Sequence, residues 1–113
     1  MSLLLSIVLA AAQPHEQPRL AKTGDCGWVH GRYGVSNGSG IHRIWMIGTN
    51  HMINLDVSDE GVGPFPELIA AGRFEPFRNF IYGDFYVCAM KGRVKGQMQE
   101  VHLMRYRKIV ITD

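Results

Sequence analysis

The most constraining feature of this sequence is a pair of strand-like segments joined by a glycine-rich turn. In residues 28–35 (WVHGRYGV) one set of positions holds Val29, Gly31, Tyr33 and Val35, and the alternate positions include His30 and Arg32. Such a period of two is typical of a β-strand. Residues 36–40 (SNGSG) contain Asn-Gly, which is a strong hairpin signal. Residues 41–47 (IHRIWMI) are rich in β-branched and aromatic side chains, which favour a second strand. Together the three segments predict a β-hairpin.

The segments that follow continue the β pattern and add one short helix. Strands are predicted at residues 51–55, 84–90 and 97–105, and residues 108–112 form a sixth strand or a continuation of the fifth. Residues 67–72 (ELIAAG) predict a short helix that ends at its glycine. In a chain of 113 residues, which suits one domain, this order predicts an all-β fold with one short helix. The expected architecture is a small five- or six-stranded OB-like barrel, although another small barrel or a meander packed on one helix would have the same order.

The register of the hairpin decides which side chains enter the core. We expect Val35 to lie opposite Ile41. This register puts Trp45 over Gly31 on the core face, with Arg43 as the one charged side chain there. The outer face would then carry a mixed apolar and basic patch suited to a protein partner, formed by His30, Arg32, Ile44, Met46 and Met52. A later strand, or the aromatic segment before the fourth strand, could instead cover this patch.

The beginning of the chain predicts export. Residues 1–12 (MSLLLSIVLAAA) combine an apolar run with a final A-x-A site, which is the layout of a secretory signal peptide. The run is far shorter than the ~20 apolar residues that cross a bilayer, so no transmembrane segment is expected in the mature protein. A buried first helix or strand is the alternative. Residues 13–25 hold two prolines and mostly polar side chains, which predicts a flexible leader ahead of a single β-barrel domain at residues 26–113.

Cys26 and Cys88 are the two cysteines of the chain. If the signal peptide is cleaved, the protein matures in the periplasm or outside the cell, where a disulfide persists. A bridge would close a loop of about 60 residues, worth ~4 kcal/mol in the chain-entropy model. Two buried free thiols are the alternative. A metal site at these residues is not expected, because neither cysteine belongs to a CxxC pair.

Three motifs together resemble a known group of proteins. They are residues 26–32 (CGWVHGR), residues 43–49 (RIWMIGT) and residues 83–88 (GDFYVC). From residue 26 to about residue 111 the chain is similar to a group of small exported bacterial proteins, several with lipoprotein signals, to which no function is assigned. The resemblance implies export and a compact domain. It does not imply a catalysed reaction. Since no cysteine directly follows the apolar run here, a lipid anchor is not expected.

The net charge of +2 conceals two regions of opposite sign. Residues 56–84 contain six acidic and two basic side chains, whereas residues 91–108 contain six basic and one acidic. In an OB-type barrel the loop between the last two strands lines the usual binding face. Lys91, Arg93 and Lys95 lie in that loop and predict contact with an anionic glycan, a lipid headgroup or an acidic protein patch of the envelope. A solvated hairpin tip that prevents edge pairing is the alternative.

Side chains suited to catalysis are scattered along the chain. Ser36, Ser39 and Ser58 lie in predicted turns or loops, which does not suit a catalytic serine, and the glycines at Gly34, Gly38 and Gly40 lead into a strand and do not form a phosphate-binding loop. In the expected register His42 would face Asp56 on the outer side of the sheet, and a carboxylate beside an imidazole is half of a metal or acid–base site. A third partner is missing. We therefore expect no catalysis, no cofactor and no bound metal.

These features predict an exported binding or interaction module of the bacterial cell envelope. Nucleic acid is not an expected partner, because the protein is exported and a fold alone does not assign a function. The alternatives are a structural accessory protein of the envelope and a small metal-dependent enzyme that uses His42 and Asp56. The residues expected to bind a partner are Lys91, Arg93, Lys95, Arg32, Met46 and Met52.

Overall fold

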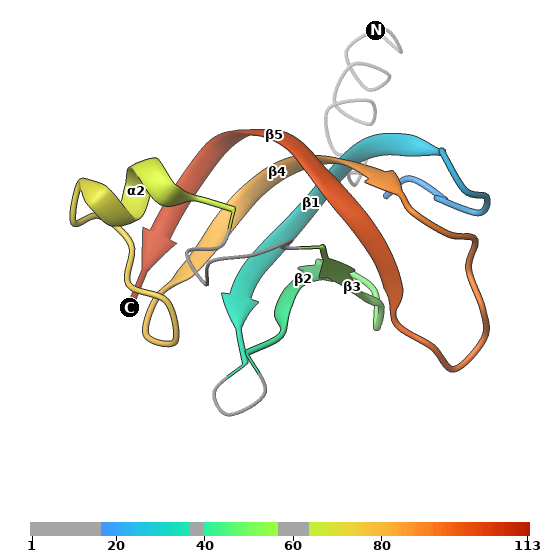
Figure 1. Cartoon of the computed structure of the whole chain (residues 1–113), viewed down its shortest axis with the longest axis horizontal. Coiled ribbons are helices and arrows are strands. Elements are labelled where there is room, and N and C mark those ends of the chain that lie inside the picture. The colour runs from blue at the N-terminus through green and yellow to red at the C-terminus, as the bar shows by residue number, and fades with distance from the viewer. Residues whose placement is uncertain (1–16, 37–39, 57–63) are drawn as a thin grey trace, which may run out of the picture.

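The computed structural model describes residues 17–36, 40–56 and 64–113, which form one closed barrel (Figure 1). Its strands are β1 (Cys26–Val35), β2 (His42–Met46), β3 (Met52–Leu55), β4 (Phe80–Ala89) and β5 (Gln99–Thr112). A short helix, α2 (Pro66–Ala70), separates β3 from β4 in the chain. In the described residues, the predicted all-β fold with one short helix is confirmed. The predicted signal peptide at residues 1–12 lies outside the described residues.

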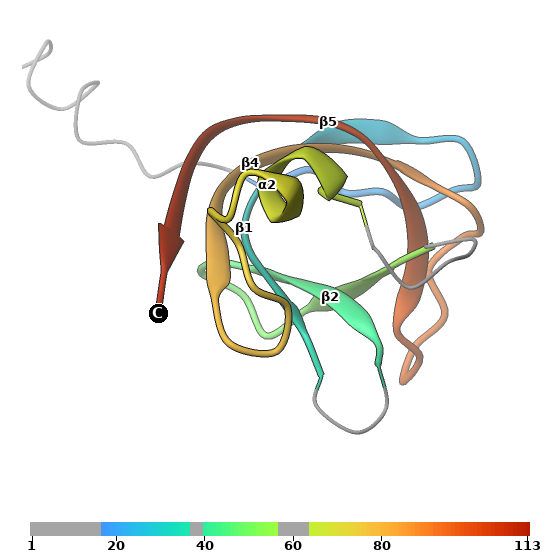
Figure 2. The same ribbon diagram turned by 60° about the vertical axis from the view of Figure 1, so that its left-hand side comes forward.

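The strands close the barrel in the order β1-β2-β3-β5-β4 (Figure 2). β1 pairs antiparallel with β2 and β4, whereas β3 pairs parallel with β5. This is the arrangement of an OB-like barrel, so that prediction is also confirmed, with five strands. Residues 108–112 continue β5 and do not form a sixth strand.

Alternate residues of each strand point into the barrel and form its core. In β1 these are Val29, Gly31 and Tyr33, as the period of two predicts. The core also receives the apolar side chains of the other strands and of the segment around α2. Among its fully buried members are Ile44, Phe65, Ile81, Phe85, Val87 and Val101.

The β1–β2 hairpin has a different register from the expected one. Val35 pairs with His42, not with Ile41. Ile41 instead belongs to the turn, where its carbonyl oxygen accepts a hydrogen bond of 2.9 Å from the backbone N–H of Ser36. Because side chains alternate along a strand, a shift of one residue moves every side chain of β2 to the opposite face.

The corrected register reverses the expected positions of the β2 side chains. Ile44, and not Trp45, lies over Gly31, where a Cβ atom would come within 2.4 Å of Ile44 Cγ2. Trp45 and Arg43 are on the outer face, so Arg43 is not the charged residue of the core that we expected. His42 takes the interior position instead and is 8% exposed.

α2 and its flanking residues pack over the core between the long strands (Figure 2). The helix begins at Pro66, which needs no hydrogen-bond acceptor in the first turn, and buries Leu68. Phe65, directly before it, makes edge contacts with the rings of Tyr33 and Tyr106. No helix within the described ranges is long and apolar enough to span a bilayer.

β5 is a long strand that bends around the barrel. Its first residues, 99–101, pair with β3, and residues 101–112 pair with β4. The register between β4 and β5 shifts twice, and Lys108 adopts a positive φ of 55° at one shift. Such bulges bend a strand and increase its twist, which allows one strand to pair with two neighbours in a small barrel.

Residues 17–25 pack against the barrel, although the sequence predicted a flexible leader there. Leu20 is 3% exposed and belongs to the core. The side chain of Gln17 donates to the carbonyl oxygens of His30 and Ile47 and accepts from the N–H of His30. The packed domain therefore begins at least as early as Gln17. The rest of the expected leader, residues 13–16, lies outside the described residues.

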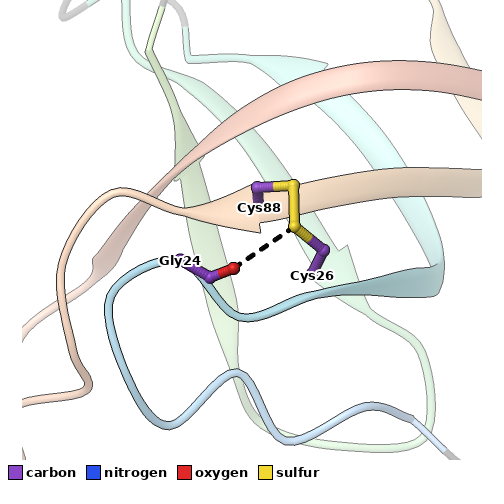
Figure 3. The surroundings of a disulfide bond; sticks show 3 residues. All are labelled: Gly24, Cys26 and Cys88. Carbon is purple, nitrogen blue, oxygen red and sulfur yellow. Dashed lines mark hydrogen bonds between the residues drawn. A yellow bond between two sulfur atoms is a disulfide. The ribbon is translucent and has the colours of Figure 1, made fainter.

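The predicted disulfide between Cys26 and Cys88 is present (Figure 3). The two residues are direct partners in the β1–β4 ladder, with their Cα atoms 4.0 Å apart. The Sγ atom of Cys26 also lies 3.4 Å from the carbonyl oxygen of Gly24. The bridge fastens the beginning of β1 to the end of β4, and with them the segment that leads into β1.

Candidate functional site

A groove of about 1000 Å³ opens beside the loop between β4 and β5. It is lined by residues 18–21, 50–53 and 93–99 together with Met46. We call it the basic groove. The three segments are far apart in the sequence, and the barrel brings them together because β3 pairs with the beginning of β5.

A buried glutamine holds one side of the basic groove. The Nε2 atom of Gln99 donates to the carbonyl oxygens of Leu20 at 2.7 Å and of Lys91 at 2.8 Å. The backbone N–H of Arg93 donates to the carbonyl oxygen of Ala21 at 3.2 Å. These bonds fix the β4–β5 loop to the N-terminal segment, so this side of the groove is formed before any ligand arrives.

Arg93 reaches from this side to the β2–β3 turn. Its Nη2 atom lies 2.6 Å from Nε2 and 3.1 Å from Nδ1 of His51, and a neutral imidazole accepts such a bond. Both side chains are exposed. Since this contact is at the surface, an incoming anion can compete for the guanidinium without opening the core.

The lining of the basic groove has one sign of charge and several methionines. Arg19, Arg93 and Lys95 contribute positive charge, and none of the described residues that line the groove is an aspartate or a glutamate. Its apolar part includes Met46, Met52 and Met98. Methionine is flexible and polarisable and adapts to irregular partners. The groove therefore suits a ligand that combines negative charge with apolar groups.

Four of the six residues predicted to bind a partner line the basic groove: Met46, Met52, Arg93 and Lys95. Lys91 does not line it. Its ammonium group lies 3.7 Å from a carboxylate oxygen of Glu100, which neutralises part of its charge. Arg32 is also elsewhere, on the outer face of β1 and close to the rings of Trp45 and Phe80.

The predicted outer patch of His30, Arg32, Ile44, Met46 and Met52 is not formed. Ile44 is fully buried and Met46 is 7% exposed, because the register shift turns both into the barrel. His30 and Arg32 remain on the outer face. There the Nδ1 atom of His30 lies 3.1 Å from Asp84 Oδ1.

The predicted pair of His42 and Asp56 is wrong for the same reason. His42 is inside the barrel, where its Nδ1 atom lies 2.6 Å from the hydroxyl of Tyr33. Asp56 instead approaches Nδ1 of His102 at 3.8 Å. Burial raises the pKa of Tyr33 and lowers the pKa of His42, so the interior pair is a neutral one. The described part of the chain contains no cluster of three side chains that could hold a metal ion.

The contribution of the N-terminal segment to the basic groove was not predicted from the sequence. Arg19 and its neighbours lie in the stretch that was predicted to be flexible. One signal was available there, since Leu20 is the single large apolar residue between residues 13 and 25. A lone leucine in a polar stretch can indicate a point of attachment to the core.

Comparisons of the chain with models of protein families, with curated proteins and with solved structures find no match. The resemblance to a group of small exported bacterial proteins therefore stays a prediction. The geometry and charge of the groove are the basis on which a function can be assigned.

Proposed function

We propose that this protein is an exported binding module of the bacterial cell envelope, which holds an acidic segment of a partner protein in the basic groove. The observation that carries the proposal is the lining of the groove. Arg19, Arg93 and Lys95 surround a floor rich in methionine, and the lining contains no acidic side chain among the residues that the structure describes. A cationic concave surface attracts anionic ligands and raises their local concentration.

The composition of the groove favours a peptide over other anionic ligands. Methionine and arginine are enriched at protein interfaces, where they combine adaptable apolar contact with directed hydrogen bonds. A glycan or a lipid headgroup would use the positive charges and leave the methionines without apolar partners. The volume of about 1000 Å³ also exceeds what a single headgroup needs.

The location outside the cytoplasm rests on two features of the chain. Residues 1–12 have the layout of a signal peptide, and the Cys26–Cys88 disulfide is typical of an oxidising compartment. The resemblance to exported bacterial proteins agrees with both. Export also separates the barrel from the nucleic acids that many OB-type barrels bind, so a protein partner is the more suitable proposal.

Binding to a defined acidic probe tests the proposal. The probe is a fluorescein-labelled peptide in which glutamate and leucine alternate, and fluorescence anisotropy measures its affinity. We expect Arg93→Ser/Lys95→Ser to weaken binding roughly tenfold, because each partly exposed charge contributes about 0.2–1 kcal/mol and Arg93 also donates hydrogen bonds. Lys91→Ser is the matched control, since Lys91 is in the same loop but outside the groove.

Three results would overturn the proposal. Equal binding by the wild type and by Arg93→Ser/Lys95→Ser would show that the basic groove does not bind the peptide. A loss that is equally large in Lys91→Ser would indicate attraction to net charge alone. Binding to phosphatidylglycerol vesicles or to alginate, without binding to the peptide, would replace the protein partner with a lipid or a glycan.

A further inference from the structure

A second, smaller pocket lies on the outer face of β1 and β2. Its volume is about 250 Å³, and Arg32, Gly34, Arg43, Trp45 and Phe80 contribute to its lining. Within the described ranges, no residue that lines it is acidic. We call it the arginine pocket. Of the described residues, Met52 alone lines both this pocket and the basic groove, so the pocket can bind a ligand whether or not the groove holds a peptide.

The aromatic rings of the pocket hold Arg32 in place. Its Cζ atom lies 5.2 Å from the centre of the Trp45 ring and 4.6 Å from that of Phe80. Phe80 can approach because the neighbouring residue is Gly34, where a Cβ atom would come within 2.8 Å of the Phe80 ring. Rings engage the flat faces of a guanidinium, so the N–H groups in its plane stay available.

Arg43 contributes a hydrogen-bond donor without an acceptor. Its Nε atom is buried and has no hydrogen-bond partner in the described part of the chain. Its Nη1 atom has only a weak sulfur acceptor, Met52 Sδ at 4.0 Å. Arg43 pairs with Gly34 across the β1–β2 ladder and stands diagonally opposite Arg32. Neither arginine forms a salt bridge with a described residue.

Two arginines line one pocket that has no carboxylate from the described residues, which makes the pocket suited to an anion. A buried N–H group normally has an acceptor, and an ordered water or an ion is one explanation for a group that has none in the protein. Arginine forks match the oxygens of carboxylate and phosphate groups. The volume is below the range of about 300–1000 Å³ that is usual for drug-sized ligands, so one small charged unit fits.

We propose that the arginine pocket binds the oxyanion of a small polar ligand, a carboxylate or a phosphate carried on a unit of the size of one sugar. The terminal Nη N–H groups of Arg43 donate to one oxygen, and the in-plane N–H groups of Arg32 donate to another. Trp45, Phe80 and Met52 line the remaining sides. The basic groove, in contrast, is larger and is lined from other segments.

Nuclear magnetic resonance can test this proposal with three probes of similar size: glucuronate, glucose 6-phosphate and glucose. The chain has two tryptophans, and only Trp45 lines the pocket. We expect the indole N–H signal of Trp45 and the Nε–H signal of Arg43 to shift with at least one acidic sugar and not with glucose. The indole signal of Trp28 should stay in place as an internal control.

Two substitutions make the test specific. Arg43→Gln should weaken binding at least about tenfold, because it removes a charge-assisted hydrogen bond. Arg105→Gln is the matched control, since Arg105 is an exposed arginine that lies over Trp28, outside the pocket. If Arg43→Gln does not fold, Arg32→Lys tests the proposal in its place. This substitution retains the positive charge and loses the forked N–H groups of the guanidinium.

The outcomes separate the two sources of the oxyanion. Shifts with glucuronate alone identify a carboxylate ligand, shifts with glucose 6-phosphate alone identify a phosphate ligand, and shifts with both identify a general oxyanion site. The proposal is overturned if neither acid moves the Trp45 signal more than glucose does. It is also overturned if a folded Arg43→Gln, or Arg32→Lys in its place, binds as well as the wild type.

Discussion

At the scale of single residues, the Cys26–Cys88 pair fastens the segment that enters β1. Beside the bridge, the carbonyl oxygen of Ala89 accepts a hydrogen bond from the N–H of Gly24, and the N–H of Ala89 donates to the carbonyl oxygen of Asp25. We expect Cys26→Ala/Cys88→Ala to lower the free energy of unfolding by about 2–5 kcal/mol, as for other native disulfides of small domains. Urea unfolding followed by tryptophan fluorescence measures this difference. A loss below about 1 kcal/mol would contradict a structural role for the bridge.

A second prediction at this scale concerns two glycines of β1. A Cβ atom at Gly31 would lie 2.4 Å from Ile44 Cγ2 and 2.9 Å from the backbone oxygen of Trp45, inside a closed core. Gly31→Ala should therefore cost about 1–3 kcal/mol. At Gly34 the close neighbour is the half-exposed ring of Phe80, which can move. Gly34→Ala is thus the control, and an equal or larger loss of stability there would contradict the packing described for β1.

At the scale of secondary structure, β1 and β2 together bury one polar pair, Tyr33 and His42. Burial lowers the pKa of His42 from its ordinary value of 6.5, so below pH 6.5 the unfolded chain takes up a proton that the folded chain does not. The contribution of the neutral, buried His42 to the free energy of unfolding is fully present above pH 6.5. It decreases as the pH falls from there towards the lowered pKa of the folded state.

Urea unfolding between about pH 8 and pH 5 tests this dependence. We expect the wild type to lose stability over that range, and Tyr33→Phe/His42→Leu to lose less, because the double variant removes both polar groups. His102→Asn, at an exposed position, should behave like the wild type. A pH dependence that is unchanged in the double variant would mean that another group is responsible.

The strands show what the sequence could and could not predict. The period of two in β1 correctly assigned Val29 and Tyr33 to the core, because alternation follows directly from strand geometry. The prediction of which β2 side chains face the core was wrong, since this depends on which residue after the turn begins the strand. Both Ile41 and His42 are compatible with a strand, and only the hydrogen bond from Ser36 to Ile41 decides between them.

At the scale of the whole molecule, the basic groove shows why the candidate site was found only in part. The charge pattern indicated Arg93 and Lys95, because a run of basic residues is visible in the sequence. Arg19 and His51 could not be assigned to the same surface, since their proximity depends on barrel closure and on the packing of Leu20. Lys91 was assigned to the site because it belongs to the same run of basic residues. Its ion pair with Glu100 could not be predicted, since a run of charges in the sequence does not show which side chains meet in the folded barrel.

The central claim is that an acidic peptide occupies the basic groove. The most direct measurement is a titration of the isotope-labelled protein with the peptide of alternating glutamate and leucine, in which nuclear magnetic resonance follows the backbone amide signals. We expect the largest shifts in residues 18–21, 50–53 and 93–99, the three segments that line the groove. Shifts that leave these segments unchanged, and occur instead on the outer face of β4 or around α2, would contradict it.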